Sequence, residues 1–213
     1  MKKKILVIDD EENIRFTFES FLFFEGYDVS TASDFNEALS LIDKSVFDLI
    51  FADILLDGKS GIEILRYIKE KNHNCPVVMI TGSPDVGTAS EALRLGAFDY
   101  IPKPVLQNTL LRVTKVALQH KVVIDEKEKY RANLEAIFRS VKDAIITVDK
   151  DLRVVEMNEA TGQICNLSRT SAGKVLSTVQ KYCAKRCFDT IQETILKKQP
   201  IEISNLECKH IDK

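Results

Sequence analysis

Hydrophobic residues in the first half of the chain fall into short continuous runs, separated by longer stretches in which they recur at helical spacing. A short apolar run bounded by turn residues predicts a buried strand, and the helical spacing predicts a helix with one apolar face. Their alternation predicts a doubly wound α/β fold, a parallel sheet with helices on both faces. The predicted strands are Lys4–Ile8, Asp28–Thr31, Leu49–Ala52, Val77–Thr81 and Phe98–Ile101.

The helices expected between these strands each present apolar residues to the sheet. Gly26 and Gly96 follow the predicted ends of two of them, where a left-handed backbone is commonly required. The predicted apolar faces consist of Ile14, Phe16, Phe18, Phe21 and Leu22; Ala38, Leu39, Leu41 and Ile42; Ile62, Leu65 and Ile68; and Ala89, Ala92 and Leu95.

After Pro104 the helical spacing continues for an unusually long stretch. Steps of four and three residues alternate there, which is the spacing of a coiled-coil seam. We expect a helical linker over residues 116–141 that pairs with a second copy as a parallel homodimer. The alternative is a shorter helix followed by a charged loop, because two seam positions are polar. The seam consists of Val116, His120, Val123, Lys127, Tyr130, Leu134, Ile137 and Val141.

The last third of the chain reads as a small α+β unit. A hairpin is expected from strands Ala144–Val148 and Arg153–Met157 across an acidic turn, followed by Asn158. Helices are expected over Ala160–Leu167 and Phe188–Leu196, and a further strand over Ile201–His210. The expected order is therefore a five-stranded domain, a long connecting helix and a partial α+β domain.

Composition and charge narrow the class of protein. The chain has 213 residues and a net charge of −2, so charge alone gives no reason to expect nucleic-acid binding by this segment. We expect no membrane association, because no apolar run approaches spanning length and the N-terminus lacks a signal-peptide core. These features, with cysteines that form no disulfide framework, predict a cytoplasmic protein.

The cysteines of the second half leave two possibilities open. Cys183 and Cys187 are four residues apart, and Cys208 lies two residues before His210. This spacing is compatible with a metal, iron–sulfur or redox site. Buried thiols that only pack are commonplace, and we expect packing here.

Polar residues with related chemistry stand at the ends of the predicted strands. Asp9 and Asp10 follow the first strand and Asp53 the third, whereas Thr81 and Lys103 close the last two. These ends meet at one edge of a parallel sheet. Clustered carboxylates call for a cation, and an all-oxygen set suits Mg²⁺.

The same residues suit phosphoryl transfer to a carboxylate. Asp10 and Asp53, with a backbone carbonyl near Leu55, are expected to hold Mg²⁺, and Asp9 to support the ion through water. Lys103 and the metal would neutralise the incoming phosphoryl group, and the Thr81 hydroxyl would hydrogen-bond one of its oxygens. Asp53 would then be the nucleophile and form an acyl phosphate.

This set of residues, with Tyr100 three positions before the lysine, resembles the flavodoxin-like receiver domain of two-component response regulators, over residues 1–120. The resemblance implies that a sensor histidine kinase phosphorylates Asp53 and that Thr81 and Tyr100 reorient in response. It also implies a cis peptide at Lys103-Pro104, dimerisation through a receiver face, and no enzymatic activity beyond the domain's own phosphorylation and dephosphorylation. Asp57 departs from the family, which often has proline there.

Residues 132–213 resemble a PAS domain through the hairpin and Asn158. A PAS sheet needs further strands, so we expect this chain to be the N-terminal part of a longer protein. The domain order resembles sigma-54-dependent transcriptional activators of the nitrogen-regulator type. In that case DNA and sigma-54 RNA polymerase are contacted only through missing C-terminal domains.

Other readings of the missing part remain open. The alternatives are the front end of a histidine kinase or a cyclic-dinucleotide synthase, or a stand-alone adaptor. The PAS ligand, the kinase partner, the target genes and the sign of regulation are not specified by the sequence.

Overall fold

The computed structural model describes residues 2–56, 58–71, 74–83, 86–165, 167–179 and 185–201. The chain divides into two compact units, Met1–Glu128 and Lys129–Lys213. Several predictions lie outside the described residues. They are the departure at Asp57, the side chains of Cys183, Cys187 and Cys208, and the strand Ile201–His210.

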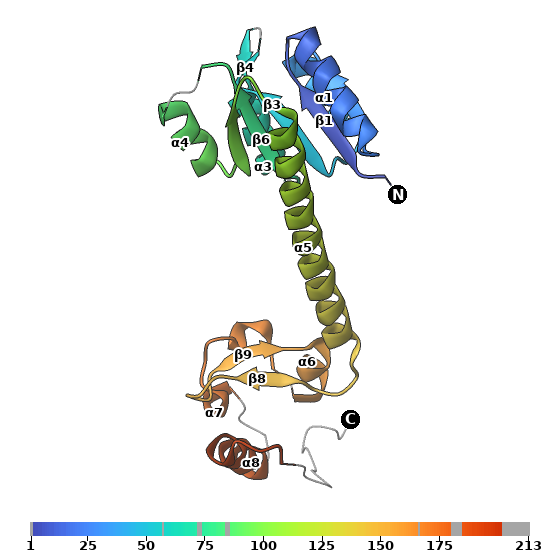
Figure 1. Ribbon diagram of the computed structural model, residues 1–213. Helices are drawn as coiled ribbons and strands as arrows, with labels where there is room; N and C mark the ends of the chain where they lie inside the picture. The colour runs from blue at the N-terminus through green and yellow to red at the C-terminus, as the bar shows by residue number, and fades with distance from the viewer. Residues whose placement is uncertain are drawn as a thin grey trace. The chain divides into compact units, whose positions relative to one another are not determined.

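The first unit is built on a parallel five-stranded sheet (Figure 1). Its strands are ordered β2-β1-β3-β6-β7, so the order reverses between β1 and β3. The predicted doubly wound sheet is confirmed, with each strand within one residue of its expected limits. The strands are β1 (Lys4–Ile8), β2 (Asp28–Ala32), β3 (Leu49–Asp53), β6 (Val77–Thr81) and β7 (Asp99–Pro102).

Helices cover both faces of this sheet (Figure 1). One face packs against α2 (Phe35–Lys44), α3 (Gly61–Glu70) and α4 (Val86–Arg94). The other packs against α1 (Glu12–Phe24) and the first part of α5 (Gln107–Ser140). β1, β3 and β6 are buried on both sides, which explains why they read as continuous apolar runs.

The predicted apolar face of α1 is wrong at Phe16. Phe18 and Leu22 are buried, but Phe16 is 70% exposed. Residues four apart share a helix face, whereas residues two apart point to nearly opposite sides. Phe16 therefore points away from the sheet that Phe18 contacts.

A short hairpin that the pattern does not predict follows β3. It consists of β4 (Leu55–Leu56) paired with β5 (Lys59–Ser60). Gly58 in its turn has a φ of +79°, as Gly26 and Gly96 do at their helix ends with +88° and +87°. Strands of two residues are too short to give an alternating pattern.

The helical linker is a single helix through Ser140, so the alternative of a charged loop is excluded. Leu110, Val113, Ala117 and Leu118 bury one side of α5 against the sheet. Farther along, most of the predicted seam is exposed. The exposed apolar seam residues are Val116, Val123, Tyr130, Leu134 and Ile137.

The second unit contains the predicted hairpin. Strands β8 (Ile146–Val148) and β9 (Val154–Met157) pair antiparallel around a small core of Val154, Leu167 and Leu176. Its helices are α6 (Glu159–Cys165), α7 (Leu176–Val179) and α8 (Lys185–Lys197), with a 3₁₀ turn at Arg169–Ser171. No helix in the described ranges has the length and apolar character needed to span a membrane.

The buried Asn158 side chain joins the end of the linker to this hairpin. Its amide donates to the carbonyl oxygens of Val141 and Asp143, at 3.2 and 2.8 Å. Its Oδ1 accepts from the backbone N–H groups of Ile145 and Thr161, at 2.9 and 3.1 Å. A buried amide with its donors and acceptor satisfied fixes the local backbone.

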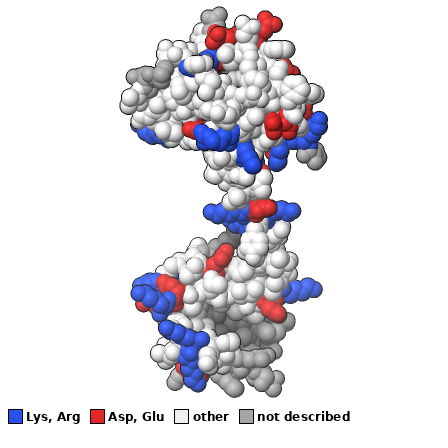
Figure 2. Space-filling view, in the orientation of Figure 1, with Lys and Arg blue, Asp and Glu red and all other residues white. Residues whose placement is uncertain are grey.

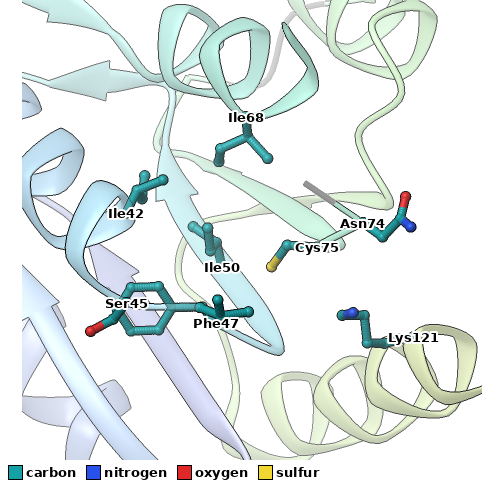
Figure 3. Close-up of a pocket in the computed structure, with 9 residues that line it drawn as sticks. Ile42, Ser45, Phe47, Ile50, Ile68, Asn74, Cys75 and Lys121 are labelled. Atoms are coloured by element: carbon teal, nitrogen blue, oxygen red, sulfur yellow. The ribbon is translucent and has the colours of Figure 1, made fainter. Parts of the chain in front are cut away.

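At the edge of the first unit opposite the acidic strand ends, a small pocket lies beside Cys75 and Lys121 (Figure 3). Lys121 is buried at the end of the apolar side of α5 and pairs with Asp125 one turn later. The Cys75 thiol donates to the Pro76 carbonyl oxygen at 3.5 Å. Burial raises the pKa of Cys75 to about 12.

We predict that Cys75 reacts slowly with iodoacetamide in the native protein at pH 8. Because its thiol pKa is raised, the reactive thiolate is present in only about one molecule in ten thousand at that pH. Peptide mass spectrometry should find Cys75 modified much more slowly than the more exposed Cys165. The difference should disappear in urea; equal native rates contradict the prediction.

Candidate functional site

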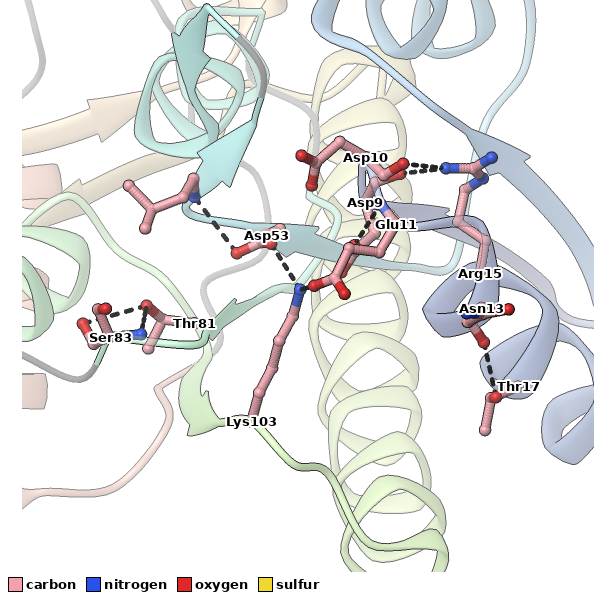
Figure 4. A network of polar contacts seen from close by, with 11 residues as sticks. Asp9, Asp10, Glu11, Asn13, Arg15, Thr17, Asp53, Thr81, Ser83 and Lys103 are labelled. Atoms are coloured by element: carbon pink, nitrogen blue, oxygen red, sulfur yellow. Dashed lines mark hydrogen bonds and ion pairs between the residues drawn. The ribbon is translucent and has the colours of Figure 1, made fainter.

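Four strands of the sheet end at one edge and bring the predicted site residues together (Figure 4). Asp9 follows β1, Asp53 ends β3, Thr81 ends β6 and Lys103 follows β7. Asp9, Asp53 and Thr81 are at most 3% exposed. Because the strands are parallel and in register, residues far apart in sequence share one pocket.

Lys103 is the central cation of this pocket (Figure 4). Its Nζ lies 2.7 Å from Asp53 Oδ2, 2.9 Å from Asp9 Oδ2 and 2.9 Å from Glu11 Oε1. Burial alone would lower the pKa of Lys103, but these three carboxylates outweigh it and raise the pKa above its usual value. The predicted cis peptide at Lys103-Pro104 is confirmed.

Asp9 is the most deeply buried acid of the site. Burial raises the pKa of its carboxyl group, and the nearby Lys103 opposes that shift only in part. Asp9 Oδ1 accepts a hydrogen bond from the Glu11 backbone N–H at 3.0 Å. Among the described residues, Oδ2 makes the ion pair with Lys103 but no hydrogen bond.

The acidic residues fit a divalent cation. Ligand oxygens of Asp9, Asp10 and Asp53 all lie within 4.8 Å of one another. These three carboxylates, which include the buried Asp9 Oδ2 that accepts no hydrogen bond from the described residues, form a hard, all-oxygen donor set of the kind that Mg²⁺ prefers. Leu55, whose carbonyl was predicted to join this set, begins β4 and donates its N–H to Asp53 Oδ1 at 3.2 Å.

The two predicted switch residues lie on neighbouring strands. The Thr81 hydroxyl accepts a hydrogen bond from the Ser83 backbone N–H at 3.2 Å. Tyr100 is half-buried on β7, and its hydroxyl lies 3.4 Å from the hydroxyl of Thr88 on α4. The Thr81 hydroxyl is therefore held by the loop that follows β6, while Tyr100 reaches the adjacent helix.

Sequence reasoning missed Arg15, a residue that orients the acidic loop, the segment that carries Asp9 and Asp10. Its guanidinium donates to the backbone carbonyl oxygens of Asp9 and Asp10, at 2.7 and 2.9 Å (Figure 4). Arg15 lies about one turn into α1, where it reaches back to the preceding loop. The sequence signal that could have revealed it is an arginine six residues after Asp9 and five after Asp10.

Gly61 is a second residue that sequence reasoning missed. A Cβ at this position would lie 1.9 Å from the carbonyl oxygen of Asp53. The N–H of Gly61 also donates to the Ile54 carbonyl oxygen at 2.9 Å. The start of α3 can therefore approach the backbone of β3 only without a side chain.

A doubly wound sheet with an acidic pocket, a lysine ion-paired to its central aspartate and a buried threonine at its edge defines a class of phosphoryl-accepting signalling domains. The model of the response regulator receiver domain family matches residues 5–115. The chain therefore belongs to the response regulator receiver domain family.

Similar proteins include bacterial regulators. The chain is 40% identical to the nitrogen assimilation regulatory protein NtrX of Azorhizobium caulinodans over 121 residues, which cover 56% of this chain and 27% of that protein. It is 31% identical to the alginate biosynthesis transcriptional regulatory protein AlgB of Pseudomonas putida, over 86% of this chain and 42% of AlgB. The chain thus spans less than half the length of these relatives.

A solved structure agrees with the fold of the first unit. The beryllofluoride-activated NtrC4 receiver domain dimer is 32% identical, with a TM-score of 0.54. The match covers 55% of this chain and 98% of the NtrC4 chain. The coverage corresponds to a complete receiver domain in that structure.

We predict that Gly61→Ala destabilises the first unit by about 1–3 kcal/mol, because the new methyl group overpacks against the Asp53 backbone. Urea denaturation would measure the loss. Gly82→Ala is the matched control, since its methyl group would meet only the Lys103 side chain at 3.9 Å. Equal stability of the two variants contradicts the packing argument.

Proposed function

We propose that this chain receives a phosphoryl group on Asp53 from a sensor histidine kinase and passes the signal through α5 to an output. The observation that carries the proposal is the placement of Asp53 2.7 Å from Lys103 Nζ and within 4.8 Å of two further acids. A carboxylate in this setting is oriented and held close to a fixed positive charge. Family membership supports the same role.

The transfer step is a displacement at phosphorus. A carboxylate oxygen of Asp53 forms a bond to phosphorus as the bond from phosphorus to the phosphohistidine nitrogen breaks. The imidazole nitrogen keeps the electron pair of that bond. Lys103 keeps its proton, as its raised pKa requires, and neutralises charge on the phosphoryl oxygens. Catalysis is limited to this phosphorylation and to hydrolysis of the product.

Asp9, Asp10, Asp53 and the Leu55 carbonyl are the groups we assign to Mg²⁺. When bound, the ion supplies positive charge that stabilises the phosphoryl oxygens during transfer. Arg15 supports this arrangement from the protein side, because it holds the backbone of the acidic loop. The exposed Asp10 carboxylate gives the site an opening to solvent.

We assign signal transmission to Thr81 and Tyr100. In this proposal the Thr81 hydroxyl gives up its hydrogen bond with Ser83 and forms one with a phosphoryl oxygen. The Tyr100 ring then reorients in response. The contact of Tyr100 with Thr88 would then change, which links the pocket to α4. The receiver face whose contacts with a second copy would change on phosphorylation consists of α4, β7 and α5.

We predict that acetyl phosphate with Mg²⁺ adds one phosphoryl group to the wild-type chain and none to Asp53→Asn. The amide is too weak a nucleophile to form the acyl phosphate. Intact-protein mass spectrometry would measure the added mass. Asp28→Asn, at the exposed far end of β2, should label like the wild type. Labelling that survives in Asp53→Asn contradicts the assignment.

The linker is proposed to pair with a second copy of the chain. Its exposed Val123, Tyr130, Leu134 and Ile137 follow the four-and-three spacing along one side of α5. In a parallel pair, Glu126 of one copy flanks the seam opposite Arg131 of the other, which matches opposite charges. The NtrC4 receiver, a relative of similar fold, is a dimer.

Leu134→Lys should weaken self-association by about tenfold or more, because it replaces an apolar contact with a desolvated charge in the seam. Sedimentation velocity over a concentration series would measure the effect. Ala132→Lys adds the same charge off the seam and should leave the dimer intact. A dimer equally stable in both variants excludes α5 as the interface.

The output is proposed to be sigma-54-dependent transcription activation, with a PAS domain over residues 132–213. The proposal is supported by the similarity to NtrX, a nitrogen assimilation regulatory protein, and to AlgB, a transcriptional regulatory protein whose match extends over 86% of this chain. Contacts with DNA and sigma-54 RNA polymerase are assigned to further domains, because this chain spans less than half of those relatives. A Walker phosphate loop downstream in the gene would support this assignment, and a phospho-acceptor histidine box would overturn it.

A further inference from the structure

Glu11 is a third partner of Lys103 that the phosphoryl-transfer roles do not use. It stands directly after the acid pair and precedes the first residue of α1. Its carboxylate lies 2.9 Å from Lys103 Nζ, as close as that of Asp9 (Figure 4). Glu11 is not among the carboxylates that are grouped closely enough to share a cation.

The carboxylate of Glu11 is held by Lys103 and not by its own helix. Glu11 occupies the N-cap position of α1, where Ser, Thr, Asp or Asn is usually preferred. Its side chain makes no capping hydrogen bond. The Glu11 side chain pairs with the Lys103 ammonium, whereas its backbone N–H donates to Asp9 Oδ1 and its carbonyl oxygen accepts from the N–H groups of Ile14 and Arg15.

The Lys103 ammonium is already engaged by three carboxylates: it hydrogen-bonds Asp53 and Glu11 and makes an ion pair with Asp9. An ammonium group has three N–H donors, and three carboxylates surround Nζ within 2.9 Å. A phosphoryl group on Asp53 needs the same ammonium, so its oxygens compete with these carboxylates for Nζ. The arrangement therefore sets up a competition for Lys103.

Exposure decides which partner leaves. The Asp9 side chain is 0% exposed, and breaking its ion pair would leave a buried charge without compensation. Asp53 cannot be the partner that leaves, because it carries the phosphoryl group. The Glu11 side chain is 60% exposed, so water can replace Lys103 at little cost.

We propose that Glu11 is a positioning residue that holds Lys103 in the resting site and competes with the phosphoryl group for it. Glu11 thereby lowers the affinity of the site for a phosphoryl group. The inference rests on the proposed function of Asp53. The ligand is an anionic tetrahedral group on the Asp53 carboxylate, and the Glu11 side chain competes with it for Lys103.

The test is the affinity of the full chain for beryllofluoride in the presence of Mg²⁺, measured by amide chemical-shift titration. Three variants accompany the wild type. Glu11→Gln removes the competing charge. Glu11→Asp keeps the charge but shortens the side chain by about 1.5 Å, which takes it out of contact with Lys103. Glu12→Gln removes an exposed charge one residue farther along as the control.

Both Glu11 variants should bind beryllofluoride about two- to fivefold more tightly than the wild type, the range expected for loss of an exposed ion pair. Glu12→Gln should bind as the wild type does. Unchanged affinity in Glu11→Gln overturns the inference. Tighter binding in Glu11→Gln with wild-type binding in Glu11→Asp also overturns it, because the effect is then general charge repulsion.

Failure of the proposed function has a different signature. If the wild type and all variants fail to bind beryllofluoride with Mg²⁺, Asp53 is not a phosphoryl acceptor, and the competition at Lys103 falls with it. If the wild type binds beryllofluoride and the Glu11 variants bind it with the same affinity, the proposed function stands and the Glu11 inference alone is wrong.

Discussion

The ion pair between Lys103 and the carboxylates of Asp9 and Asp53 is the interaction on which the site depends. Two aspartates that are at most 3% exposed would repel each other and be costly to keep ionised without a cation between them. The Lys103 ammonium lies within 2.9 Å of both. It lets the carboxylates stay close enough to form a cation site and keeps a positive charge beside Asp53.

This ion pair exists because of how the backbone is arranged. Parallel pairing brings the end of β3 beside β1 on one side and β6 on the other, with β7 next to β6, so that side chains separated by up to 94 positions meet. Gly61 lets α3 begin against the Asp53 carbonyl, and Arg15 fixes the carbonyl groups of the acidic loop. The chemistry of Asp53 is therefore set by backbone contacts as much as by neighbouring charges.

The sequence predicts what depends on periodicity and on strand ends, and misses what depends on three-dimensional approach. Buried strands such as Leu49–Asp53 are recognisable because both faces are apolar, and their ends locate Asp53 and Lys103. Phe16 is predicted on the buried face of α1 but is exposed, because apolar character alone does not show on which side of a helix a residue lies. The third carboxylate on Lys103, from Glu11, and the fit at Gly61 arise from distances between elements, for which a single sequence carries no periodic signal.

The most direct test of the account is to locate the phosphoryl group chemically. After brief treatment with acetyl phosphate and Mg²⁺, borohydride would reduce the acyl phosphate and leave a mass change on the modified residue. Peptide mapping should find that change at Asp53 and at no other acid, including Asp9, Asp10 and Glu11. Reduction at any of those three residues, or at none, would contradict the account.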